Sequence, residues 1–400
     1  MVPMSDLIGD QLGPGDAAAD RSDHGSLAGP QVRGDHGSRR QAGLPMDAYD
    51  YGLPDAAIAQ RPVEPRSAAR LLVAPGLAGG GLPAHATVAD LPRMLGPGDV
   101  LVVNETRVLA ARLPLTKATG GRAEVLLLEP VDLQGAVWEA LVRPARRLPS
   151  PTLLFESAEG PPVVEVGEAV GGAESGRRLV RLLDPTVVDR AGIMPLPPYI
   201  EGTLSDPDRY QTVYSAPGDP GDRSAAAPTA GLHFTPELLD ACRDAGARLA
   251  RVALAIGLDT FRPITAPTAE EHVIHSERYA VPAETMAACA EADRVIAVGT
   301  TAVRALESAA GTGRLSGRTN LYIHGDHRFR VVDVLITNFH LPRSSLLLLV
   351  EAFCGPVWRE LYATALAEGY RFLSFGDAMV VGRRGPKGQP LPLIPPGPAG

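Results

Sequence analysis

Two histidines stand where a loop meets a helix, and histidine is the side chain best suited to moving protons near neutral pH. His233 lies in the stretch AAAPTAGLHFTPELL, directly before a helix that Thr235 caps and Pro236 starts. His340 lies in ITNFHLPRSS, between a predicted strand and a helix capped near Ser344. Either imidazole can act on a ligand, although a half-buried structural histidine is the alternative at both positions.

The stretch GTTAVRALE, residues 299–307, is suited to an oxygen-rich ligand at a helix N-terminus. Gly299 lets the backbone turn after a strand, and the hydroxyl of Thr300 lies among unpaired N–H groups that attract anions. Arg304 and Glu307 are three residues apart, so they share one face of the helix. A threonine cap beside an exposed ion pair is the alternative.

The stretch DRYQTVY has residue types that can hold a base or a phosphate. Arg209 supplies charge, Tyr210 a stacking surface and Gln211 hydrogen bonds to a base edge. The signal is weak on its own, because each residue is also common in ordinary loops.

The formal net charge is −8, whereas a protein that coats a nucleic-acid backbone should be basic. A nucleic-acid substrate would therefore need a local patch. In NETRVLAARL, Asn104, Arg107 and Arg112 interrupt an apolar run where two domains are expected to join, so they can contact phosphates. A solvated edge strand is the alternative.

Histidine pairs and cysteines give little support for a metal. EHVIHSERY contains His272 and His275, and HGDHRF contains His324 and His327, but neither pair has a third ligand at a typical spacing. The three cysteines are far apart and form no CxxC, which argues against a disulfide framework. No GxSxG, Walker A, HExxH or strand-linked GxGxxG occurs, so hydrolase, NTPase, zinc-protease and dinucleotide-binding functions lack support.

The composition, 45% apolar and 21% charged, is typical of a soluble globular protein. Residues 1–45 lack periodicity, and residues 383–400 are rich in Pro and Gly, so both are expected to be disordered. The first 46 residues contain no apolar core like that of a signal peptide. The longest aliphatic run, residues 346–350, is far shorter than the roughly 20 residues that span a bilayer. We therefore expect a cytoplasmic protein.

The elements that must position these residues show two different sequence patterns. From residue 235 onward, helix and strand patterns alternate, which predicts an α/β domain with a largely parallel sheet. Between residues 100 and 183, short apolar runs recur with turn residues between them, which is typical of a small antiparallel β-barrel or sandwich. The simplest architecture is an α/β domain, residues 46–100 and 190–382, with a β-barrel domain inserted at residues 101–189.

Taken in order, these stretches resemble the S-adenosylmethionine:tRNA ribosyltransferase-isomerases of queuosine biosynthesis. The stretches that carry the resemblance lie between about residues 47 and 381 and are YDYGLPDAAIAQRPVEPRSAARLLV, LGPGDVLVVNETRVLAARL, MPLPPYIEGTLSDPDRYQTVYS, AAPTAGLHFT, HSERYAVP, GTTAVRALE, LITNFHLPRSSLLLLVEAFCG and YRFLSFGDAM. The resemblance implies an α/β domain with an inserted β-barrel. It also implies that the ribosyl part of S-adenosylmethionine is transferred to the aminomethyl group of a 7-deazaguanine at the wobble position, in the anticodon loop of tRNA. Epoxyqueuosine forms, adenine and methionine leave, and no metal is implied.

The implied reaction needs a base for a ribose C5′ proton, which the neighbouring sulfonium acidifies, and an acid that assists the departure of adenine. The resemblance places His233 and His340 in these roles without dividing the steps between them. Glu307 or Asp377 can offset the sulfonium charge. The residues expected to bind S-adenosylmethionine or the modified base are Arg209, Gln211, Thr229, Thr300, Arg304, Glu307, Asn338 and Asp377. The residues expected to contact tRNA are Asn104, Arg107, Arg112 and Tyr210.

Three loops differ from the pattern usual in this family. Asp222 and Arg223 precede AAAPTAGLHFT, Leu258 and Asp259 stand where small residues are typical, and HGD replaces a PGY turn. These differences leave two alternatives open. One is a related S-adenosylmethionine-dependent ribosyl transferase with a different acceptor, and the other is a non-catalytic RNA- or nucleotide-binding homologue. The polar motif residues are retained, which counts against the second.

Overall fold

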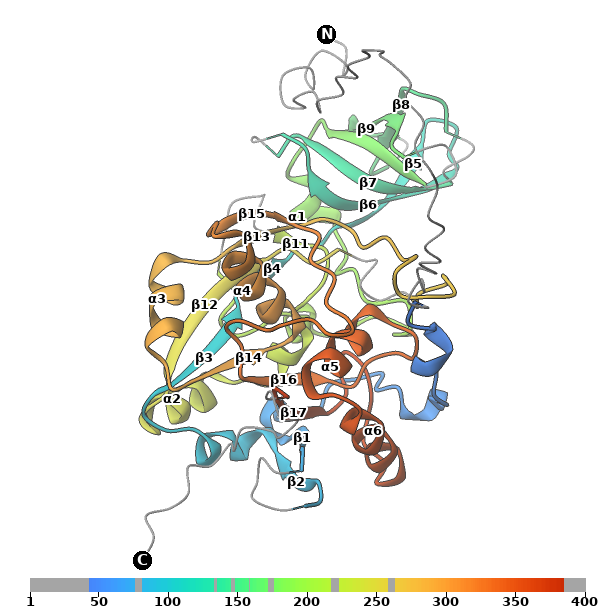
Figure 1. Ribbon diagram of the computed structural model, residues 1–400. Helices are drawn as coiled ribbons and strands as arrows, with labels where there is room; N and C mark the ends of the chain where they lie inside the picture. The colour runs from blue at the N-terminus through green and yellow to red at the C-terminus, as the bar shows by residue number, and fades with distance from the viewer. Residues whose placement is uncertain are drawn as a thin grey trace, which may run out of the picture. The chain divides into compact units, whose positions relative to one another are not determined.

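The computed structural model describes residues 43–75, 81–132, 135–144, 148–157, 159–171, 176–216, 223–257 and 263–384. Most of the predicted N-terminal extension and C-terminal tail, together with Asp222, Leu258 and Asp259, lies outside the described residues. Nine of the described strands form one sheet (Figure 1). In spatial order they are β15 (Ser316–Thr319), β13 (Glu277–Ala280), β12 (Arg248–Leu254), β3 (Asp99–Asn104), β14 (Arg294–Val298), β16 (Val334–Asn338), β17 (Ala378–Gly382), β1 (Arg70–Val73) and β2 (Ala84–Thr87).

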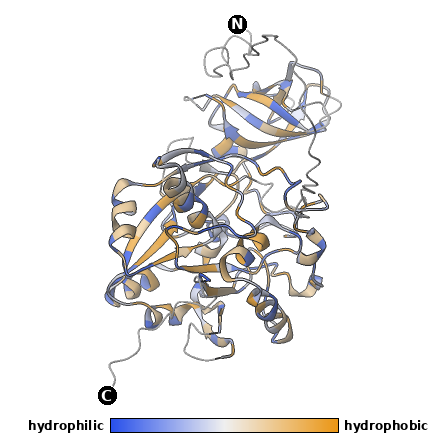
Figure 2. Ribbon diagram, viewed as in Figure 1, coloured by the Kyte–Doolittle hydropathy of each residue, from blue (hydrophilic) through white to orange (hydrophobic). Residues whose placement is uncertain are grey.

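The core of this sheet is parallel. β12, β3, β14 and β16 pair in parallel, and so do β17 and β1. β17 runs antiparallel to β16, and β13, β15 and β2 pair antiparallel with their neighbours. The ribbon of β14 and β16 is largely apolar (Figure 2), as expected of strands covered on both faces. The predicted α/β class is confirmed.

Helices accompany the sheet, and two of their starts confirm the capping prediction. The hydroxyl of Thr235 accepts a hydrogen bond from the backbone of Leu238 at 3.2 Å, and that of Ser344 accepts one from Leu347 at 3.2 Å. Within the described residues, no helix is long and apolar enough to cross a membrane. The α-helices are α1 (Val187–Ala191), α2 (Pro236–Asp244), α3 (Ala283–Glu291), α4 (Thr300–Thr312), α5 (Ser345–Cys354) and α6 (Val357–Ala367). The 3₁₀ helices include Met46–Tyr49, Asp55–Ala57, Arg66–Ala68, Val88–Met94, Pro207–Tyr210 and Thr229–His233.

A closed antiparallel barrel forms the second body of secondary structure. Its interior is filled by side chains such as Val125, Ala140 and Leu154, all fully buried. Its strands follow the order β10 (Arg177–Leu182), β7 (Val137–Arg143), β6 (Arg122–Pro130), β5 (Arg112–Lys117), β8 (Thr152–Phe155) and β9 (Pro162–Ala169). The predicted inserted barrel is confirmed as an architecture.

The chain enters and leaves the barrel through a paired neck. Arg112, at the start of β5, forms an antiparallel bridge with Ile193. The amide of Arg112 donates to the carbonyl of Ile193 at 3.2 Å, and the amide of Ile193 donates back at 2.8 Å. The two ends of the insertion are therefore hydrogen-bonded to each other.

One strand differs from its expected place. Residues 101–104 were expected in the barrel, but they belong to β3 at the centre of the main sheet, where all six residues of the strand are buried. Its parallel partners β12 and β14 come from more than 140 residues further along the chain, so the local pattern could not reveal them. β4 (Arg107–Val108) also lies outside the barrel, since it pairs with β11 (Arg223–Ser224). We propose that the inserted domain begins near Arg112.

The loop between α6 and β17 is tight. β17 begins only at Ala378, after the loop has crossed residues 368–377. Leu373 has a positive φ of 68°, and a Cβ on Gly376 would lie 2.4 Å from the carbonyl oxygen of Arg371. The loop is therefore held in one backbone shape, and its carbonyl groups are available to neighbouring side chains.

Candidate active site

Polar side chains gather beyond the carboxyl ends of β14 and β16, the edge at which α/β sheets bind ligands. Two cavities of about 30 Å³ each lie there, and both are lined by Thr229, Asn338, His340 and Leu346. We call them the histidine cavities. A third cavity, of about 40 Å³, shares Leu346 with them and is lined by Glu277, Arg304 and Tyr322 among others. We call it the arginine cavity. Cavities of this size accept one functional group of a ligand each.

His340 is held by its backbone and keeps its ring toward the histidine cavities. Its amide donates to the hydroxyl of Tyr362 at 2.9 Å, and its carbonyl accepts from the hydroxyl of Tyr51. The ring Nε2 lies 2.8 Å from the hydroxyl oxygen of Thr337. Burial lowers the pKa of His340 to about 3. The imidazole is therefore neutral at pH 7, in the form that can accept a proton.

Asn338 and Thr229 form one polar wall of the histidine cavities. The hydroxyl of Thr229 donates to the side-chain oxygen of Asn338 at 3.0 Å. The Asn338 amide donates to the carbonyl of Leu373 at 3.1 Å, so the tight loop fixes which way the amide faces. Thr300 and Thr301 line one of the two cavities, and the buried Thr301 hydroxyl has no hydrogen-bond partner among the described residues. The site thus has a hydroxyl available to a ligand.

Arg304 and Glu277 form a buried ion pair at the arginine cavity. Their side chains are 8% and 7% exposed, and Nη1 of Arg304 contacts Oε2 of Glu277. Nε of Arg304 donates to the carbonyl of Leu321 at 3.1 Å, and the other oxygen of Glu277 accepts from the amide of Gly257 at 3.0 Å. Nη2 of Arg304 is buried and finds no hydrogen-bond partner in the described part of the chain. A buried guanidinium in that state favours an anionic ligand.

Glu307 binds the backbone of the segment before β16, whereas Arg304 pairs with Glu277. Its carboxylate accepts backbone N–H groups of Arg330 at 2.8 Å, Val331 at 3.0 Å and Val332 at 3.1 Å. The alternative of an exposed ion pair between Arg304 and Glu307 is therefore replaced by two separate buried contacts, because each residue has a long-range partner.

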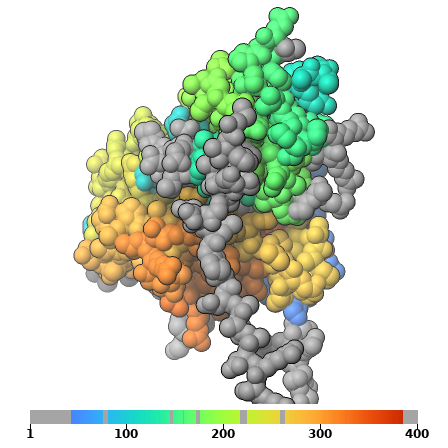
Figure 3. All heavy atoms as spheres, turned by 90° about the horizontal axis from the view of Figure 1, so that it is seen from above, coloured from blue at the N-terminus to red at the C-terminus, as the bar shows by residue number. Residues whose placement is uncertain are grey.

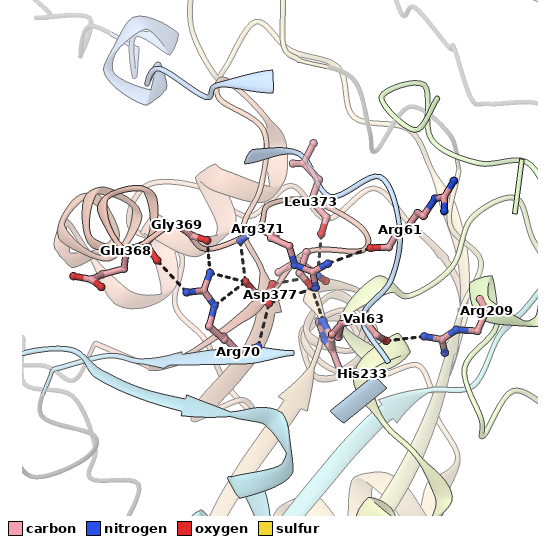
Figure 4. A network of polar contacts seen from close by, with 12 residues as sticks. Arg61, Val63, Arg70, Arg209, His233, Glu368, Gly369, Arg371, Leu373 and Asp377 are labelled. Atoms are coloured by element: carbon pink, nitrogen blue, oxygen red, sulfur yellow. Dashed lines mark hydrogen bonds and ion pairs between the residues drawn. The ribbon is translucent and has the colours of Figure 1, made fainter. Parts of the chain in front are cut away.

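Asp377 is neutralised by protein groups (Figure 4). Its carboxylate accepts the amide of Arg371 at 2.8 Å and the backbone and side chain of Arg70, whose Nη2 lies 3.2 Å away. The Arg371 guanidinium lies 3.6 Å from its other oxygen. Because two arginines already neutralise its carboxylate, Asp377 is poorly suited to stabilise a sulfonium.

His233 belongs to this same network and not to the cavities. Its Nε2 lies 2.8 Å from the carbonyl oxygen of Gly376, and its Nδ1 lies 3.1 Å from that of Ala230 (Figure 4). Burial lowers the pKa of His233 despite these two carbonyls. His233 is absent from the described residues that line the histidine and arginine cavities. Its ring therefore ties the 3₁₀ helix Thr229–His233 to the tight loop.

The expected ligand residues in DRYQ also have protein partners. Nη2 of Arg209 donates to the carbonyl of Val63 at 2.9 Å. Gln211 is buried, and its side-chain amide accepts from the N–H of Val108 at 3.0 Å and donates to the carbonyl of the same residue at 2.7 Å. Tyr210 is fully buried against Phe375, which excludes stacking on a base in this conformation. This stretch holds β4 in place.

The four residues expected to contact tRNA do not form one patch. Asn104 is fully buried and bonds the backbone of Leu254 through both ends of its amide, at 3.0 and 3.1 Å. Arg112 lies in the neck, half-buried. Arg107 is exposed, with Nη1 3.4 Å from the hydroxyl of Ser215. Only Arg107 of these four is open to a large partner.

Sequence reasoning did not assign Glu277 or Tyr322. Glu277 lies in EHVIHSERY, a stretch whose histidine spacing is its most visible feature, yet in the described residues no group of three metal-binding side chains forms. Its role follows from its partner Arg304, which is 27 residues away. Tyr322 has a buried hydroxyl without a partner among the described residues, and its ring packs edge-on against His272.

Comparison with known proteins gives consistent relatives over most of the chain. A family model described as "Queuosine biosynthesis protein" matches residues 46–381. A protein of Rubrobacter xylanophilus named S-adenosylmethionine:tRNA ribosyltransferase-isomerase is 51% identical over 337 residues, covering 84% of this chain and 97% of the relative. A protein of the same name from Thermus thermophilus is 48% identical over 350 residues, covering 84% and 99%. The crystal structure of an S-adenosylmethionine tRNA ribosyltransferase from Thermotoga maritima matches at 34% identity and a TM-score of 0.46, covering 83% of this chain and 99% of that one.

Proposed function

Since the chain belongs to the family of queuosine biosynthesis proteins, we infer that it is an enzyme that transfers and isomerises the ribosyl group of S-adenosylmethionine onto tRNA. The observation that carries this inference is the match of the family model to residues 46–381. The acceptor is the aminomethyl group of a 7-deazaguanine at the wobble position, and the compartment is the cytoplasm, where tRNA is found.

His340 is the group that takes the C5′ proton. Its ring lines both histidine cavities, and a neutral imidazole carries no charge that would repel a sulfonium. Asn338 and Thr229 border the same cavities and hold the ribose hydroxyl groups. Thr300 and the buried hydroxyl of Thr301 bind a neighbouring polar atom of the co-substrate.

The arginine cavity receives the methionine end of S-adenosylmethionine. The α-carboxylate is anionic, and the buried Nη2 of Arg304 supplies a charge-assisted hydrogen bond to it. Glu277 lies beside Arg304 and attracts the α-ammonium group. Leu346 lines both this cavity and the histidine cavities, so a molecule anchored at Arg304 passes Leu346 to bring its ribose to His340.

The remaining predicted residues position these groups. His233, Asp377 and Glu307 fix loops through backbone contacts, while Gln211 and Asn104 hold strand ends. None of these five needs to touch the substrate for the reaction to depend on it.

The function is tested by incubating the protein with S-adenosylmethionine and a tRNA that carries 7-aminomethyl-7-deazaguanine. We expect free adenine, free methionine and a tRNA heavier by an epoxycyclopentanediol group, measured by chromatography and mass spectrometry. Binding of S-adenosylmethionine without turnover points to a different acceptor. Neither binding nor turnover points to a non-catalytic homologue.

The arginine cavity is tested by removing one buried ion pair and comparing it with another. The double variant Arg304→Met/Glu277→Gln should weaken binding of S-adenosylmethionine roughly 10- to 100-fold by calorimetry, because a charged hydrogen bond is lost. The control is Arg294→Met/Asp99→Asn, which removes a buried pair at the amino end of β14, opposite the site. Equal binding by both variants would place the methionine end elsewhere.

A further inference from the structure

Two arginines lie directly opposite each other at the edge of the main sheet. Arg278 of β13 and Arg318 of β15 are register partners in the antiparallel pair. Like charges in this arrangement repel each other. Their side chains are 41% and 47% exposed. The pair therefore needs an anion beside it, and β15 is the outermost strand of the sheet.

One carboxylate, that of Glu129 on barrel strand β6, contacts both arginines. Nε of Arg278 lies 2.7 Å from Oε1 of Glu129, and Nη2 of Arg318 lies 3.1 Å from Oε2. Two guanidinium groups thus share one negative charge, and the cluster of three keeps a net positive charge. A phosphate has the geometry and the charge to bind the same two guanidinium groups.

The arginine pair separates two cavities that both open toward solvent. The outer cavity, about 340 Å³, is lined by both arginines and by no carboxylate among the residues described. The inner cavity, about 280 Å³, is lined by both arginines, by Arg177, Glu129 and Glu139, and also by Gly257, His275 and Glu277. These last three also line the arginine cavity. Neighbouring cavities that share lining residues therefore extend from the sheet edge toward the proposed co-substrate site.

We propose that Arg278 and Arg318 bind backbone phosphates of the tRNA beside the nucleotide that is modified, and that Glu129 competes with the RNA for them. This proposal rests on the proposed function, since it takes tRNA as the substrate. A chain with a net charge of −8 needs a local positive patch to receive RNA. Residues around β13 and β15, coloured yellow to orange, reach the surface of the face seen in Figure 3. A flexible nucleotide whose phosphate rests on the pair can reach inward along the cavities.

The competition gives two variants with opposite expected effects. In Arg278→Ala/Arg318→Ala, affinity for an unmodified tRNA transcript with guanine at the wobble position should fall roughly tenfold or more at low salt. The slope of log affinity against log salt should decrease by about one for each arginine. In Glu129→Gln, affinity for the same transcript should rise, because the competing charge is gone. Binding is measured by filter retention across a salt series.

Matched controls separate this surface from the fold and from the function. Arg243→Ala removes an arginine of α2 that is also 47% exposed and ion-paired, so it should leave the salt slope unchanged. Affinity of each variant for S-adenosylmethionine and its thermal unfolding midpoint should stay near the wild-type values. The proposal is overturned if the double arginine variant binds tRNA as the wild type does. It is also overturned if Glu129→Gln weakens binding, since the cluster would then act only in docking the barrel. A wild-type protein that binds tRNA but releases no adenine contradicts the proposed function and leaves the phosphate contacts to be judged by binding alone.

Discussion

The two histidines at predicted loop–helix junctions, His233 and His340, lie in different surroundings. His233 has a backbone carbonyl within hydrogen-bond distance of each ring nitrogen. His340 bonds two tyrosines through its backbone groups, has one ring nitrogen on a threonine hydroxyl, and lines both histidine cavities. Both rings are buried and both have a lowered pKa. Burial alone therefore does not distinguish a catalytic histidine from a structural one, whereas the direction of the ring's contacts does.

The largest expected effect comes from His340→Gln. Loss of the proposed base should lower the rate of adenine release by about 10²- to 10⁴-fold, while the amide can still bond Thr337. The rate is measured in single turnover at saturating S-adenosylmethionine. A variant that keeps full rate would remove His340 from proton transfer and end the contrast with His233.

A smaller effect, of a different kind, is expected from His233→Ala. A buried backbone carbonyl loses its hydrogen-bond donor, so the free energy of unfolding should fall by about 1–3 kcal/mol in urea titration. Adenine release by the folded fraction should change by less than about tenfold, because a positioning group is lost and no proton donor or acceptor is. A large loss of rate with unchanged stability would reverse the roles assigned to the two histidines.

The last effect is a pH dependence of stability that belongs to His340. Its pKa of about 3 in the folded protein lies below the ordinary 6.5, so between these values the unfolded chain binds the extra proton. The contribution of the neutral ring to the free energy of unfolding is fully present above pH 6.5. It decreases as the pH falls, by about 1.4 kcal/mol per pH unit. His233 acts in the same direction. Urea titrations at several pH values should give a shallower acid slope for His340→Gln, and an unchanged slope would mean that the ring is hydrated.

The sequence predicted elements better than contacts. The caps at Thr235 and Ser344, the alternating helices and strands, and the barrel follow from local residue patterns. The sequence pattern assigns residues 101–104 of β3 to the barrel, because an apolar run looks the same in a barrel strand and in a central parallel strand. The difference lies only in partners that are far away in the chain.

The same limit explains the candidate site. The sequence does not distinguish a polar residue at a strand end that faces a ligand from one that bonds the next loop. Asn338 borders the histidine cavities, whereas Asn104 bonds Leu254, 150 residues away, through its amide. The spacing in GTTAVRALE indicates Arg304 as a candidate ligand residue. Its partner Glu277 cannot be inferred from the sequence, because the two residues meet only in the folded protein.

The paired neck at Arg112 and Ile193 has a consequence for how this chain can vary. A segment whose two ends are hydrogen-bonded to each other behaves, for the rest of the polypeptide, like a short turn whatever its length. Loop-closure entropy grows only slowly with length, by about 0.6 kcal/mol per doubling, and the neck reduces even that dependence for the sheet. The barrel can therefore change in length during evolution at little entropic cost to the main sheet, which makes it a part of the molecule that is free to vary.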